Sequence, residues 1–195
     1  RIIFNGNGYD DAWVAEAARR GLANLRDTVD CMPAYIDKKN IDLFTKHAVL
    51  TETEMRARYE IHLENYCKVT AIEAHTLLDM VTRCILPAAG KYADSLAQTL
   101  FHKKNCGISL PTVMEERTLT RVSEQSAALF RICEDLQTAL HNAPAADGGI
   151  DVARWYRAEI AARTQQAGEL INQLETIVDA ACWPYPTYAD ILFSV

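Results

Sequence analysis

The chain has 195 residues, of which 49% are hydrophobic and 24% charged, and its formal net charge at pH 7 is −6. This composition belongs to a globular domain or a part of one, and it excludes a disordered chain. No run of Lys and Arg exceeds a pair, and no apolar stretch approaches the roughly 20 residues that span a bilayer. We therefore expect no nucleic acid and no membrane as partners, and a cytoplasmic location.

The first residues predict a short strand followed by short helices. "RIIF" is strand-like, "NGNG" is a turn signal, and Asp10 or Asp11 can cap a helix that ends before Gly21. The stretch 34–47 predicts another short helix whose inward-facing residues are Ile41, Leu43 and Phe44.

The chain opens on Arg1 rather than Met, directly in the predicted strand. This start predicts that residues 1–195 form a single helical domain that is a fragment of a larger chain. Residues 1–8 would then be the junction to an upstream domain.

A very long helix is predicted from Thr51, where Glu54 completes a capping box, to about Lys104. Because Pro87 removes a backbone donor and clashes with the preceding turn, we expect a kink near residues 83–87. Apolar positions follow two faces of this helix, which predicts packing from several sides. The first face holds Met55, Tyr59, His62, Tyr66, Val69, Thr76 and Met80, and the second Leu63, Cys67, Ala74, Leu77, Val81 and Cys84.

Two further long helices are predicted near residues 112–141 and 151–181, each with a heptad-like apolar seam. "NCGISLP" and "HNAPAADGG" are short connections, which place consecutive helices antiparallel. The predicted fold is all-α: an antiparallel bundle of three long helices, the first kinked near Pro87, with a short N-terminal strand and helix segment and an extended C-terminal tail.

The glycine pair in "NGNGYDD" does not predict a nucleotide site. The third Gly of a dinucleotide-binding loop would stand at position 11, where Asp11 would repel a phosphate. Gly6 and Gly8 instead predict a tight turn with positive φ.

No pattern predicts a catalytic, cofactor-binding or metal site in this chain. No Glu is followed three residues later by His, and there is neither a nucleophile elbow nor a Cys-x-x-Cys pair. His62 and His75 could ligate a metal together with Glu60, Glu64 or Glu73. Nothing in their spacing singles out a metal site, so hydrogen-bonded or partly exposed histidines are the favoured interpretation. A small-molecule sensor would depend only on a buried His62 and Tyr66.

The charges predict solvated helix faces. Five acid–base pairs stand four residues apart with the acid first, the favourable orientation: Glu52 with Arg56, Glu54 with Arg58, Glu64 with Lys68, Asp79 with Arg83, and Glu159 with Arg163.

Particular stretches resemble the C-terminal region of type III glutamine synthetases. They are "RIIFNGNGY", "RRGLANL", "CMPAYI", "LFTKHAVLTETEMRARYEIHLENYCK", "IEAHTLLDM", "ILPA" and "WPYPTYADILFSV", in order along the chain. The similarity is weakest between about Phe101 and Arg154.

The resemblance implies a parent ligase that joins ammonia to glutamate with ATP and a divalent metal such as Mg²⁺, through a γ-glutamyl phosphate. It places those sites in an upstream catalytic domain, so no catalytic residue carries over to this chain. It also implies a homo-oligomeric ring, in which this segment would have a structural, subunit-assembly role with the catalytic domain and other subunits as partners. The alternative is a stand-alone helical adaptor for protein partners.

The tail 183–195 has an unusual number of aromatic residues for a chain end, and Pro184 and Pro186 disfavour a helix there. We predict a docking tail that lies on this chain's own helices, on the catalytic domain or on another subunit.

Overall fold

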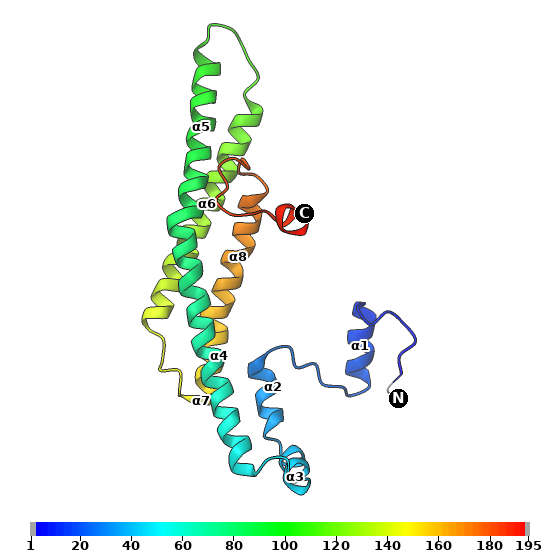
Figure 1. The fold of residues 1–195 in the computed structure, drawn as a ribbon. Helices are drawn as coiled ribbons and strands as arrows, with labels where there is room; N and C mark the ends of the chain where they lie inside the picture. Colours follow the sequence, from blue (N-terminus) through cyan, green and yellow to red (C-terminus); the bar gives the residue numbers. More distant parts are fainter. Residues whose placement is uncertain (1–2, 194–195) are drawn as a thin grey trace. The chain divides into compact units, whose positions relative to one another are not determined.

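The computed structural model describes residues 3–193, except the side chains of Tyr188 and Ala189, and all regular structure in that range is helical (Figure 1). The all-α prediction is therefore confirmed. The α-helices are α1 (Asp11–Arg19), α2 (Thr28–Tyr35), α3 (Lys38–Lys46), α4 (Glu52–Met80), α5 (Leu86–Asn105), α6 (Val113–His141), α7 (Gly149–Tyr156), α8 (Ala162–Glu175) and α9 (Tyr188–Leu192). Two π-helical turns, η1 (Val81–Ile85) and η2 (Arg157–Ala161), interrupt them.

The chain divides into two compact units, residues 1–64 and residues 65–195. Across residues 3–193, no helix combines the length and the apolar character needed to cross a membrane.

The predicted N-terminal strand is wrong for Ile3 and Phe4, which have no regular structure; residues 1–2 lie outside the described range. The Phe4 ring stacks on Trp13, with 4.6 Å between ring centroids, and Arg20 donates a hydrogen bond of 3.1 Å to the Ile3 carbonyl. The hydrogen bond from Arg20 uses a carbonyl group that a strand would have paired with a neighbouring strand.

Helix α1 begins and ends close to the predicted positions, whereas the helix predicted over residues 34–47 begins only at Lys38, as α3, and α2 was not predicted. Asp10 caps α1 by accepting a hydrogen bond from the Ala12 amide, and Gly21 follows the helix with φ of 72°. Helix α2 packs against α3, and Ile41 is buried. Leu43 is 53% exposed, so its predicted inward orientation is wrong.

The predicted long helix is present as one helical run from Glu52 to Asn105. Its capping box is confirmed: the Thr51 amide donates to Glu54 at 2.8 Å, and the Glu54 amide donates to the Thr51 hydroxyl at 3.2 Å.

The run changes its hydrogen-bond pattern just before Pro87. At η1 the Leu86 amide donates to the carbonyl of Val81, five residues earlier, which defines a π turn. Pro87 has no amide hydrogen to donate to Arg83 and would crowd that carbonyl in a regular helix. The wider turn accommodates the proline while the helix continues into α5.

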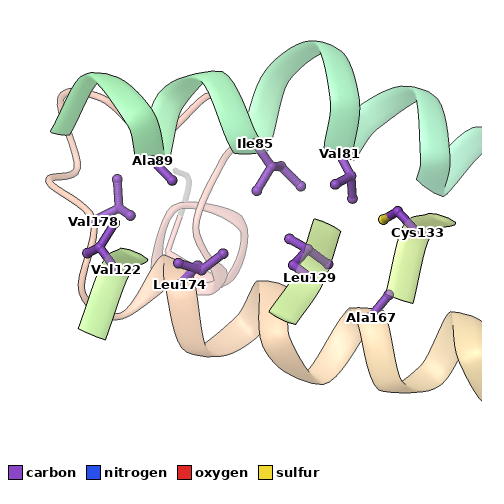
Figure 2. Close-up of a cluster of buried hydrophobic side chains, with 9 residues drawn as sticks. All are labelled: Val81, Ile85, Ala89, Val122, Leu129, Cys133, Ala167, Leu174 and Val178. Atoms are coloured by element: carbon purple, nitrogen blue, oxygen red, sulfur yellow. The ribbon is translucent and has the colours of Figure 1, made fainter. Parts of the chain in front are cut away.

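Within residues 65–193, a cluster of buried apolar side chains joins η1, α5, α6 and α8. Helix α6 packs against α5 and against α8, and the core side chains point toward one another from these segments (Figure 2). The buried members are Val81, Ile85, Ala89, Val122, Leu129, Cys133, Ala167, Leu174 and Val178. Burial also raises the pKa of the Cys133 thiol, so this cysteine acts as a small core residue.

The two predicted apolar faces of the long helix differ in burial. In the second unit, Cys67, Ala74 and Val81 of the second face are fully buried. Of the first face, Val69 is 42% exposed and Met80 36% exposed, so the prediction of packing from several sides is wrong there. Side chains within residues 65–193 bury only one side of this segment.

Three of the predicted acid–base pairs close at 2.7 Å: Glu52 with Arg56, Asp79 with Arg83, and Glu159 with Arg163. They are exposed or partly exposed, and such pairs contribute only a few tenths of a kcal/mol each.

The C-terminal residues form two parts rather than one extended tail. Trp183 and Tyr185 pack against the core of their own unit, and a hydrogen bond between the Tyr185 hydroxyl and the Cys84 sulfur raises the pKa of Tyr185. Thr187 and Asp190 then form a second capping box, with the Thr187 amide donating to Asp190 at 2.8 Å.

That capping box begins the short helix α9, so the extended conformation predicted for the whole tail is wrong for Tyr188–Leu192. Local hydrogen bonding after Pro186 is sufficient to start a helical turn. Leu192 is 73% exposed and Phe193 79% exposed, and residues 194–195 lie outside the described range.

Trp183→Ala should lower the free energy of unfolding by about 1–3 kcal/mol, because a half-buried indole is lost from the core surface. Phe193→Ala is the matched control and should change it by less than about 0.5 kcal/mol, since that ring is exposed. Urea denaturation of the 195-residue chain measures both. Equal effects of the two substitutions would contradict the docking of Trp183.

Candidate functional site

The predicted metal-site candidates do not come together in the described residues. Within residues 3–193, no three His, Cys, Asp or Glu side chains lie close enough to hold a metal ion. His62 and His75 are both exposed, so the buried His62 on which a small-molecule sensor would depend is not observed.

The turn at Gly6 and Gly8 exists, but its predicted positive φ is wrong. Among the described glycines, positive φ occurs at Gly21, Gly107 and Gly149. The Asn7 side chain accepts a hydrogen bond from the Tyr9 amide at 3.1 Å and holds the turn instead. A Cβ on Gly6 would lie 2.6 Å from the Phe4 ring, so close approach of that ring requires glycine here.

The most unusual electrostatic feature lies where α5 turns into α6. The Glu115 side chain comes from the first turn of α6 and is only 1% exposed. Its carboxylate accepts a hydrogen bond of 2.6 Å from Lys103, near the end of α5, and Lys103 also donates to the Pro111 carbonyl at 3.3 Å. The hydrogen bond from Lys103 lowers the pKa of Glu115.

A second pair lies beside the first. Lys104 and Glu116 approach to 3.0 Å, and Thr112 donates to the same Glu116 carboxylate at 3.1 Å. The hydrogen bond from Lys104 lowers the pKa of Glu116. Two consecutive lysines of α5 therefore bind two consecutive glutamates of α6, which fixes the connection 106–112 at both ends.

Around these ion pairs, large apolar side chains face solvent. We call this surface the hairpin tip; its apolar members are Phe101, Ile108, Leu110, Val113 and Met114. Their exposed fractions range from 40% to 66%. Singly exposed apolar residues are ordinary, but five within fourteen consecutive positions form a concentration that is typical of a contact surface.

The two ion pairs of the hairpin tip connect the end of α5 to the start of α6. Both carboxylates are held ionised by lysines, and their hydrogen bonds order the loop before any partner arrives. A loop that is already ordered loses less conformational entropy when a partner binds. Sequence reasoning missed this site because Lys103 and Glu115 stand twelve residues apart across a loop, outside any helical pairing rule.

Comparison with known proteins identifies the family. The family described as the glutamine synthetase C-terminal domain matches residues 1–104, more than half of the chain. The chain belongs to this family. The resemblance to glutamine synthetases is thereby confirmed, and the match ends within the region where the resemblance is weakest.

Related proteins extend the glutamine synthetase similarity over the whole chain. A glutamine synthetase of Butyrivibrio fibrisolvens is 33% identical over 195 residues, covering 100% of this chain and 28% of the relative. The Type-3 glutamine synthetase of Dictyostelium discoideum is 27% identical over 99% of the chain, and a glutamine synthetase of Bacteroides fragilis is 26% identical over 99%. The chain thus spans 27% to 28% of the length of these relatives.

The Lys103–Glu115 pair predicts an acid-sensitive contribution to stability. The folded-state pKa of Glu115 lies below the ordinary value of 4.5, so the contribution is present above that value and is lost as the pH falls through the folded pKa. Glu115→Gln should therefore be less stable near pH 7 and lose less stability between about pH 5 and pH 3 than the natural chain.

Urea unfolding midpoints across this pH range test the prediction. Glu124→Gln, an exposed position on the same helix, is the control and should follow the natural profile. If Glu115→Gln and the natural chain lose stability in parallel, the pair does not make this contribution.

Proposed function

We propose that these residues form the structural, subunit-assembly region of a glutamine synthetase and contain no active site of their own. The natural protein that carries them would join ammonia to glutamate with ATP and Mg²⁺, through a γ-glutamyl phosphate formed in a separate catalytic domain. Membership of the C-terminal domain family supports this proposal, as does the small share of the relatives' length that the chain spans.

The proposed partners are the catalytic domain of the same protein and other subunits of a homo-oligomeric ring. The observation that carries this proposal is the hairpin tip, where five exposed apolar side chains are presented by a loop fixed through two ion pairs. An exposed apolar surface on an ordered loop is better suited to a stable contact than to free solvent.

The packing of the second unit suits such a role. In our proposal, α5, α6 and α8 act as an antiparallel three-helix bundle, with a bend at the π turn before Pro87. Because α6 packs against both α5 and α8, the hairpin tip is joined to the core of the second unit.

The natural full-length protein should form glutamine from glutamate and ammonia, and formation should require both ATP and Mg²⁺. The isolated 195-residue chain should form none, since it has no metal-binding or nucleotide-binding pattern. A coupled assay of ADP release with direct detection of glutamine measures both. Activity in the isolated chain, or its absence from the full-length protein, would contradict the proposal.

The double substitution Ile108→Asp and Val113→Asp should reduce the assembled size of the full-length protein without lowering its helix content. Burying the two introduced carboxylates in an apolar subunit contact would cost free energy. In the free chain both side chains face solvent, so the same substitutions should not destabilise the fold. Analytical ultracentrifugation and circular dichroism measure the two quantities.

The matched control is Leu43→Asp with Val49→Asp, since these residues are 53% and 61% exposed but belong to the first unit. This control should retain the natural assembly. An unchanged size in the hairpin-tip variant would exclude that surface as a subunit contact.

A further inference from the structure

A groove in the second unit lies between α4 with η1 on one side and α6 on the other. Its volume is about 570 Å³, and residues from all three elements line it. Helix α6 packs closely with α5 and α8, whereas α4 is not among its close-packed neighbours in the described part of the chain. The two helices therefore leave a space that no described side chain fills.

The groove has an apolar floor and a polar rim. Leu78 and Cys133 belong to or pack against the core, so the floor is fixed by the fold. Phe130 is 49% exposed, which leaves much of an aromatic ring facing solvent. Such a ring beside a rigid apolar floor is the kind of residue that dominates binding energy in interfaces.

The charged groups of the rim are acidic. Asp79 from α4 and Glu134 from α6 line opposite walls, and neither Lys nor Arg lines the groove. Asp79 pairs with Arg83 on the same helical run. Because both side chains are more than half exposed, this pair contributes little to stability and leaves carboxylate oxygens that can bind a second cation. A partner with positive charge beside an apolar stripe would satisfy both parts of the surface.

The groove is long enough to hold about three turns of a helix. Along α6 the lining residues run from Phe130 to His141, a length of about 16 Å at the usual rise per residue. The positions repeat at three- and four-residue intervals on both walls, as in grooves that accept an amphipathic helix. A helix laid there would contact α6 as α5 and α8 do.

We propose that this groove binds a basic amphipathic helix of a separate protein. A second copy of this chain is disfavoured because a symmetric contact through the groove would bring Asp79 and Glu134 against the same carboxylates of the other copy. The largely polar rim suits a reversible partner, since permanent contacts are more apolar. This role is independent of the assembly proposed for the hairpin tip.

The test uses the full-length natural protein and a labelled helical peptide of about 15 residues with leucines along one face and lysines beside them. Fluorescence anisotropy should show saturable binding that weakens with added salt, whereas the same peptide with glutamates in place of lysines should not bind. Glu134→Lys and Phe130→Ser should each weaken binding by about tenfold or more.

Matched controls separate the groove from general surface charge. Asp135→Lys makes the same charge change on the neighbouring position of α6, which does not line the groove, and Phe193→Ser makes the same aromatic change in the C-terminal residues. Both should leave the affinity within about twofold of the natural value. Equal weakening by controls and groove variants, equal binding of the glutamate peptide, or no binding would overturn the proposal.

A photo-cross-linking residue at Gln137, which lines the groove, identifies the occupant in cells. The expected product joins Gln137 to a Lys- or Arg-bearing helix of another protein, and Glu134→Lys should abolish it. A product within the same polypeptide or with a second copy would overturn the assignment to a separate partner.

Discussion

The second unit depends on a seam of apolar side chains that η1, α5, α6 and α8 bury together. Helices of 20 and 29 residues have little stability of their own in water, and their packing provides most of it. The seam contains small residues such as Ala89 and Ala167, which are fully buried and let the helices approach closely. Trp183 and Tyr185 cover one part of this seam, so these two residues form part of the edge of the core.

Where local rules determine structure, the sequence was sufficient. The capping box at Thr51 and three of the five acid–base pairs four residues apart follow from helical spacing, and the structure confirms them. Helical spacing could not predict the absence of strands within residues 3–193. The segment "RIIF" has a strand-like composition, but periodicity does not show whether another strand is present to pair with it.

Features that depend on distant residues were beyond prediction. Lys103 meets Glu115 across a loop, and Tyr185 meets Cys84 from a hundred positions away, so neither contact has a sequence rule. The exposed face of α4 shows the same limit. Its apolar residues follow helical spacing, but this spacing does not show whether another helix packs against them. Pro87 accounts for the π turn η1, whereas the sequence of η2 contains no proline and offers no comparable reason.

We propose that this helical region serves a glutamine synthetase by presenting an ordered contact surface rather than by chemistry of its own. The first measurement to make is hydrogen exchange of the full-length protein in its assembled and dissociated forms. Backbone amides of residues 101–114 should exchange more slowly in the assembly, while those of residues 43–49 should be unchanged. Equal exchange of residues 101–114 in both forms would show that the hairpin tip is not a subunit contact.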